Sequence, residues 1–105
     1  MQNPTPDPVT AEPDDADVVH RPDLDRYELH VGGAQRGVAD YRERDGRIVF
    51  THTEVDVPLR GKGYSNVLVR FALDDVRASS RRAGATCWFV RDFVNAHPEY
   101  ADLFS

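Results

Sequence analysis

Cysteine and long apolar runs are both scarce in this chain. Cys87 is the single cysteine among 105 residues, so an internal disulfide is excluded, which fits a reducing cytoplasm. No apolar run approaches the roughly 18 residues of a membrane-spanning helix, and the N-terminal residues lack the apolar core of a signal peptide. We therefore expect a soluble, cytoplasmic protein of one domain with no membrane partner.

Basic residues are missing from the first nineteen positions. Residues 1–19 contain no lysine or arginine, but they hold four of the seven prolines and the five acids Asp7, Glu12, Asp14, Asp15 and Asp17. Such a segment offers too little apolar surface to offset the entropy lost on ordering. The composition predicts a disordered acidic tail over 1–19 and a folded domain over 20–105. The tail is either a solubilising extension or a docking arm.

The charge balance changes once that tail is set aside. The whole chain carries a net charge of −5, from 13 basic and 18 acidic residues, and residues 20–105 hold thirteen of each sign. A near-neutral domain lacks the basic footprint of a nucleic-acid binder, so no nucleic-acid partner is expected.

The first half of the domain has the periodicity of strands. Residues 27–31 alternate apolar and polar positions, and Gly32-Gly33 follows as a turn signal. A second strand is predicted over 34–44, and Asp45-Gly46 separates it from a β-branched run over 47–57. Together these segments predict a three-stranded antiparallel meander.

The second half has a helical period. Apolar side chains recur every four residues between Tyr64 and Arg82, which predicts an amphipathic helix that ends near Gly84. Residues 85–90 predict a fourth strand parallel to the third, and 91–96 predict a short helix before Pro98. The expected fold class is α/β: an antiparallel meander, a crossover helix and a parallel strand.

The loop Arg60–Asn66 stands between the third strand and the long helix. Gly61 and Gly63 permit a tight turn and a close backbone approach, and the helix start offers free N–H groups to an anion. Arg60 and Lys62 add positive charge. The loop is therefore a phosphate cradle or, alternatively, an ordinary basic turn. Its spacing fits neither the Walker A motif nor the dinucleotide fingerprint.

The third predicted strand has one polar face. Its period of two places His52, Glu54 and Asp56 together. The other face takes Thr51, Thr53, Val55 and Val57. A carboxylate beside an imidazole can orient it as a general base, so the sequence suggests either a base pair or an exposed polar face. A metal site from His52, Glu54 and His97 is a weaker alternative, because no established ligand spacing is present.

Two further segments offer chemistry. Cys87 falls in the predicted fourth strand, where it is either a small core residue or a thiol at the mouth of the site. The run His97-Pro98-Glu99-Tyr100 either supplies a proton donor or forms a helix-ending turn whose tyrosine packs on the core.

These motifs together resemble the GCN5-related N-acetyltransferases. The family loop has Arg or Gln, two residues, Gly, one residue, then Gly or Ala. Here Arg60-Gly61-Lys62-Gly63-Tyr64-Ser65 matches, except that Ser65 replaces the last small residue. Together with His52-Thr53-Glu54-Val55, Cys87-Trp88-Phe89-Val90 and His97-Pro98-Glu99-Tyr100, it is similar to the small NATD1-like acetyltransferase subfamily. The resemblance covers about residues 25–104.

The resemblance implies binding of acetyl-coenzyme A. It places the pyrophosphate on the N–H groups of Gly61 to Asn66, a stretch that includes Gly63, Tyr64 and Ser65. Arg60 and Lys62 assist there, and the pantetheine arm runs along the backbone of Val55 and Val57. It makes Glu54 or His52 the base, Cys87 a nucleophile or pocket lining, and Tyr100 the acid.

The implied activity is transfer of an acetyl group to an amine, the acceptor being a small molecule or a protein. The alternatives are a coenzyme A-binding module that acts through a protein partner without turnover, and a small interaction protein. The family's N-terminal helices have no counterpart in the sequence, so an open and shallow acceptor region is expected.

Overall fold

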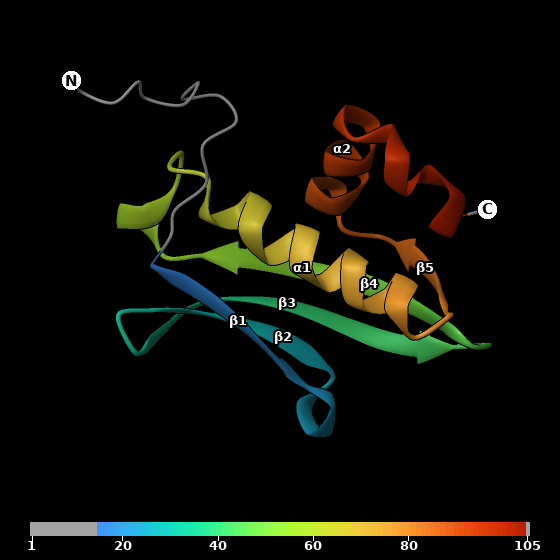
Figure 1. Cartoon of the computed structure of the whole chain (residues 1–105), viewed down its shortest axis with the longest axis horizontal. Coiled ribbons are helices and arrows are strands. Elements are labelled where there is room, and N and C mark those ends of the chain that lie inside the picture. Colours follow the sequence, from blue (N-terminus) through green and yellow to red (C-terminus); the bar gives the residue numbers. More distant parts are fainter. Residues whose placement is uncertain (1–14, 105) are drawn as a thin grey trace.

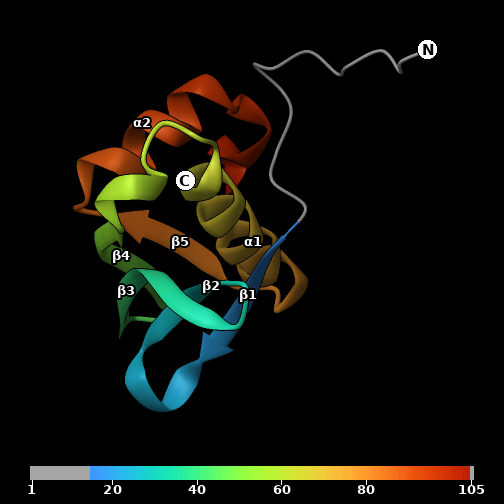
Figure 2. The same ribbon diagram turned by 90° about the vertical axis from the view of Figure 1, so that its left-hand side faces the viewer.

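The computed structural model describes residues 15–104, which form a five-stranded sheet with two α-helices over one face (Figure 1). The strands lie in chain order; the pairs β1–β2, β2–β3 and β3–β4 are antiparallel, and β5 is parallel to β4. Figure 2 shows that neither α-helix lies on the opposite face. The elements are β1 Ala16–Arg21, η1 Pro22–Leu24, β2 Arg26–Val31, β3 Ala34–Arg44, β4 Arg47–Val55, η2 Val57–Leu59, α1 Tyr64–Ala78, β5 Arg82–Ala85, α2 Trp88–Ala96 and η3 Pro98–Phe104.

The predicted meander is confirmed as β2, β3 and β4, but a further strand precedes it. β1 pairs with β2 from Ala16 to Arg21, so the structure corrects the predicted tail of 1–19 at its last four residues. Val18 packs against the core while Asp17 and Val19 face outward, and this short alternation was hidden by the acidic composition around it. The rest of the predicted tail, residues 1–14, lies outside the described residues.

The second half follows the predicted order with three corrected boundaries. Helix α1 ends at Ala78, because Ser80 has φ +61° and turns the chain toward β5. Gly84 therefore lies in β5 and does not stop the helix. The strand predicted over 85–90 lies at Arg82–Ala85, and residues 88–90 begin α2. A short apolar run fits a strand or a buried helical turn, and here Val90 faces inward from α2, as does Phe93.

The core lies between α1 and the sheet. Tyr27, Leu29 and Phe50 from the strands are almost fully buried against Leu68 and Leu73 of the helix. Burial of each such leucine contributes about 1.5–3 kcal/mol to folding. This packing holds the first turn of α1 over the carboxyl end of β4.

A polar group inside this layer ties the helix to the strands. The Tyr27 hydroxyl donates to Asp75 at 2.7 Å, and the His20 ring stacks on Tyr27 with a centroid distance of 4.2 Å. Burial and the Asp75 carboxylate raise the pKa of Tyr27, so the phenol stays protonated and donates the hydrogen bond.

The sheet is split between β4 and β5. Strand β3 accompanies β4 as far as Val55, whereas β5 pairs with β4 only from Arg47 to Phe50. The Phe50 carbonyl accepts the N–H groups of Thr86 and Cys87, which end the parallel ladder and lead into α2. In the described residues, the β4 segment 51–55 therefore has a strand on one side only.

Gly37 sets the position of that free segment. An added Cβ at Gly37 would lie 2.9 Å from the Glu54 carbonyl oxygen and 3.1 Å from a Val55 methyl carbon. Because the backbone of β4 must shift to admit it, Gly37→Ala should lower the free energy of unfolding by about 1–3 kcal/mol. Urea denaturation measures this change.

Gly84→Ala is the matched control in the same sheet. The nearest atoms to its added Cβ would belong to the Val49 side chain, the first of them at 3.4 Å. We expect a change within about 0.5 kcal/mol. Equal losses in the two variants would contradict a specific close contact at Gly37.

Candidate functional site

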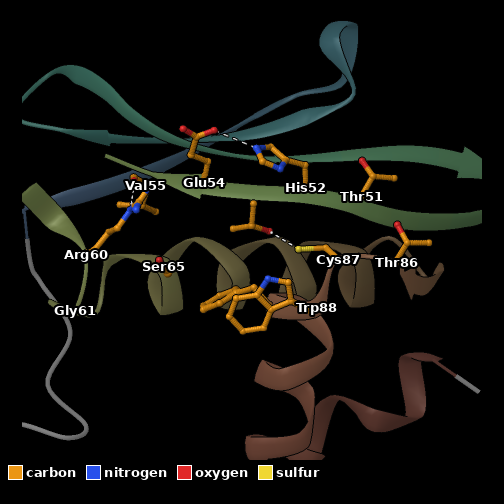
Figure 3. A pocket seen from close by; sticks show the side chains of 12 residues that line it. Thr51, His52, Glu54, Val55, Arg60, Gly61, Ser65, Thr86, Cys87 and Trp88 are labelled. Carbon is orange, nitrogen blue, oxygen red and sulfur yellow. Dashed lines mark hydrogen bonds and ion pairs between the residues drawn. The ribbon is translucent and has the colours of Figure 1, made fainter. Parts of the chain in front are cut away.

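A cleft of about 640 Å³ occupies the split between β4 and β5 (Figure 3). Its walls come from the free segment of β4, the loop before α1 and the first residues of α2. The predicted site residues in its lining are His52, Glu54, Val55, Arg60, Gly61, Ser65 and Cys87. The structure thus gathers residues that lie more than thirty positions apart in the sequence.

One end of the cleft is built as an anion cradle. Gly61 and Gly63 have φ values of +77° and +90°, a region that glycine enters without steric cost. Gly63 is the N-cap residue of α1, and no side chain caps that helix start. The N–H groups of its first turn have no partner within the helix, and the helix dipole adds positive potential. Phosphate oxygens fit this donor set.

Arg60 links the cradle to the strand. Its Nε donates to the Val55 carbonyl oxygen at 2.9 Å, which fixes the loop to the end of β4. Its guanidinium also brings a positive charge to the cleft. Lys62 is an exposed residue of the loop and does not line the cleft.

Val57, Gly63, Tyr64 and Asn66 do not line the cleft either; Gly63 is the N-cap residue between the lining residues Gly61 and Ser65. Val57 belongs to the 3-10 turn η2 and is 69% exposed, so the strand edge ends at Val55 and not at the predicted residue 57. Tyr64 is buried, and its hydroxyl donates to Asp15 at 2.9 Å; that hydrogen bond raises the pKa of the phenol. Asn66 lies in the first turn of α1.

His52 and Glu54 form a pair on the helix-free side of β4. Nε2 of His52 lies 3.1 Å from Oε1 of Glu54, and both side chains are more than half exposed. Figure 3 shows both side chains on the side of β4 away from α1. Asp56, predicted to share this face, lines one hollow together with Glu54, and the Nε of Arg36 donates to its carboxylate at 2.6 Å. A paired imidazole and carboxylate can accept a proton and pass it to solvent.

Cys87 lies on the other side of the cleft. It is the residue before α2 and not part of a strand, and its Sγ donates a weak hydrogen bond to Oγ1 of Thr53 at 3.5 Å. Two roles were predicted for Cys87, a small core residue or a thiol at the mouth of the site. The geometry favours the thiol at the mouth. The cleft thus has an acid–base pair on one side and a thiol with a hydroxyl on the other.

Tyr100 is not brought to the cleft. It lies in η3, where its hydroxyl donates to Asp74 of α1 at 2.7 Å. Burial, with the Asp74 hydrogen bond, raises the pKa of this phenol. His97 is also remote: its ring stacks on Phe93, with Nδ1 2.9 Å from the Phe93 carbonyl oxygen. Among residues 15–104, no three His, Cys, Asp or Glu side chains gather where they could hold a metal ion.

Sequence reasoning missed several residues of the lining. Thr51, Thr53, Thr86, Trp88 and Phe89 all contribute to the cleft. Trp88 is the clearest omission, because it is 74% exposed at the cleft although tryptophan usually buries most of its surface. Its place in an apolar run concealed it, since the run indicated a buried strand.

The split sheet, the glycine loop and the uncapped helix start lie within a sequence region that matches a known family of protein domains. The chain belongs to the GCN5-related N-acetyltransferase family, whose family model, described as "GCN5-related N-acetyl-transferase", matches residues 26–103. Within that family it is similar to Protein NATD1 of Bos taurus, at 40% identity over 75 residues, and of Homo sapiens, at 37% over 75 residues. Each alignment covers 70% of this chain and 66% of the relative, just under two thirds of the relative's length.

A solved structure supports the fold. A GCN5-like protein from Staphylococcus aureus, determined by NMR, matches 88% of this chain and 90% of its own with a TM-score of 0.67. The identity is 18%, so the likeness concerns the fold alone. The expected α/β class, a meander with a crossover helix and a parallel strand, is confirmed. Within the described part of the chain, no helix combines the length and apolarity needed to cross a bilayer.

Proposed function

We propose that this protein transfers the acetyl group of acetyl-coenzyme A to a primary amine. The observation that carries the proposal is the cleft itself, which has an anion cradle at one end and the His52–Glu54 pair along its edge. Membership of the acetyltransferase family agrees with this chemistry.

Backbone N–H groups and basic side chains of this chain both contribute to binding of acetyl-coenzyme A. The N–H groups from Gly61 to Asn66 hold the pyrophosphate, with Arg60 and Lys62 supplying positive charge. The free β4 edge over 51–55 offers backbone groups to an extended pantetheine arm, as in strand addition. When bound, acetyl-coenzyme A supplies a thioester whose carbonyl carbon is open to attack by an amine.

We assign acid–base catalysis to the His52–Glu54 pair on β4. An amine that arrives as its ammonium gives one proton to His52 or Glu54, and its lone pair then forms the N–C bond. As the C–S bond breaks, its electron pair leaves on sulfur, the nitrogen loses a second proton and the sulfur takes one up. The net change is one proton released to solvent. Thr53 and Cys87 face the opposite side of the cleft and can supply hydrogen bonds there.

Calorimetry on the full chain tests the cofactor part of the proposal. We expect acetyl-coenzyme A to bind, with an affinity that weakens as salt screens Arg60 and Lys62. Absence of binding at millimolar ligand would exclude acetyl transfer and simple coenzyme A binding together.

A second candidate function is a coenzyme A-binding module that acts through a protein partner without turnover. The exposure of His52 and Glu54 favours it, because more than half of each side chain faces solvent. Release of free coenzyme A thiol in the presence of amines separates the two functions. Only an enzyme releases it continuously.

Cys87→Ala tests whether the thiol takes part in transfer. We expect the variant to keep its affinity for acetyl-coenzyme A but to lose acetyl transfer, since the change removes the thiol and leaves the cradle intact. Because Cys87 is the single cysteine, the variant also removes the protein's own background in thiol assays. Mass spectrometry of the wild type then separates two roles for the thiol. In a covalent relay the Cys87 sulfur takes the acetyl group as the C–S bond to coenzyme A breaks, the thiol proton passes to the coenzyme A sulfur, and acetyl-Cys87 is detected before the amine displaces it. In direct attack by the amine no acetyl-Cys87 forms. Full activity in the variant would limit Cys87 to lining the pocket.

A further inference from the structure

A second hollow opens on the helix-free face of the sheet, beside the cleft. It has a volume of about 200 Å³ and is lined by Gln35, Arg36, Gly37, Val38, Glu54 and Asp56. Glu54 also lines the larger cleft, so this residue borders both spaces. A group bound in the hollow would meet the cleft at Glu54.

The charges in the hollow leave one negative charge in excess. Arg36 is bound to Asp56 through a 2.6 Å contact, and the two side chains neutralise each other. The Glu54 carboxylate has no arginine or lysine at such a distance among the described residues; its neighbour is the His52 ring, at 3.1 Å. A ligand with a single positive charge would balance the site.

Size and polarity further restrict the occupant. At about 30 Å³ for each water-sized group, the hollow admits about six or seven heavy atoms. Val38 supplies an aliphatic wall in register with Glu54 on the neighbouring strand. A hollow of this volume, with an aliphatic side chain beside a carboxylate, accommodates a short alkyl chain that ends in a positively charged group.

We propose that this hollow is the acceptor subsite and that it holds a short alkyl chain bearing a primary ammonium, with the nitrogen at Glu54. The proposal rests on the function proposed above and names the class of its acceptor. The same chemistry occurs in a free alkylamine and in a lysine side chain. In either case the nitrogen loses its proton to the His52–Glu54 pair at the edge of the cleft.

Amine binding can be measured without the cofactor. The full chain, labelled with nitrogen-15, is titrated with n-butylamine while the backbone amide shifts are followed. We expect saturable shifts at Gly37, Val38 and Glu54 with an affinity of about 1–10 mM, which a five-atom ligand can reach. The uncharged n-butanol should leave these amides unchanged. Equal shifts with both compounds, or shifts scattered over the surface without saturation, would overturn the proposal.

Two lysine substitutions on one row of the sheet test the location. Val19, Glu28, Val38 and Glu54 lie opposite one another across β1 to β4. Val38→Lys places an alkylammonium in the hollow, so the shift at Glu54 should fall to the level seen with n-butanol. Val19→Lys adds the same group at an exposed position two strands away and should leave the shift intact. Equal loss in both variants would show that added charge alone repels the amine.

Two further comparisons identify the source of the amine and show whether the subsite or the proposed function has failed. Nα-acetyl-lysine N-methylamide should shift the same amides if the natural source is a lysine side chain, and only n-butylamine should do so if it is a free amine.

If the wild type binds acetyl-coenzyme A but n-butylamine moves none of the hollow's amides, the subsite is wrong while the proposed function stands. If the amine binds in the hollow but acetyl-coenzyme A does not bind, the proposed function fails instead. The two failures therefore remain distinguishable.

Discussion

Glu54→Gln is expected to lower the turnover number for acetyl transfer by about 10²–10⁴-fold while the affinity for acetyl-coenzyme A stays unchanged. The amide keeps the size of the carboxylate but cannot accept a proton at neutral pH. Glu54 pairs with His52 at the edge of the cleft and lies outside the loop Arg60–Asn66 that forms the cradle. Steady-state kinetics with n-butylamine, alongside calorimetry with acetyl-coenzyme A, measure the two effects separately.

Glu43→Gln is the matched control for this substitution. Glu43 is a half-exposed glutamate on the neighbouring strand that pairs with Arg81 outside the cleft. Its variant should retain normal turnover. His52→Gln combined with Glu54→Gln should cost little more than Glu54→Gln alone if the two residues act as one unit. Normal turnover in Glu54→Gln would refute the assignment of the base.

Gly63→Val is expected to abolish binding of acetyl-coenzyme A. Gly63 has φ +90° at the N-cap of α1, where a β-branched side chain is strained and stands beside the N–H groups of the first turn. The backbone strain should therefore move the N–H donors away from the phosphates, and the valine side chain should also block access to those donors. Calorimetry at millimolar ligand should detect no binding.

Gly46→Val separates lost binding from lost stability. Gly46 has φ +78° in the β3–β4 turn, has open space around its Cβ position and lies outside the loop Arg60–Asn66 that forms the cradle. Both variants should lose about 1–3 kcal/mol of unfolding free energy from backbone strain. Only Gly63→Val should lose the ligand. An unchanged affinity in Gly63→Val would contradict the cradle.

The elements that the sequence predicted well are those whose pattern is local. Tyr27 and Leu29 alternate with polar residues, and their inward direction follows from a period of two. In α1, buried residues recur at Tyr64, Leu68, Ala72 and Val76, which a period near 3.6 requires. The meander, the long helix and the glycine loop between them could therefore be predicted without a structure.

The errors arose where composition or a short apolar run was the main signal. Ala16–Arg21 lies beside an acidic, proline-rich segment, so its alternation was outweighed by the composition, and the strand is held by pairing with β2. Cys87 and Trp88 lie in an apolar run that fits a strand or a helix. The helix forms here because the Phe50 carbonyl accepts the N–H groups of Thr86 and Cys87, which ends the parallel ladder and leaves no strand pairing for the residues that follow.

The sequence by itself determined the strand, glycine loop and helix start of the cradle, because backbone conformation and side-chain face follow from nearby residues. Only the tertiary structure decided that β5 leaves β4 at Phe50, that Cys87 meets Thr53, and that Glu54 stands between two hollows. Those facts depend on strand register and on where a ladder of hydrogen bonds ends. Both are set by contacts between residues that are distant in the chain.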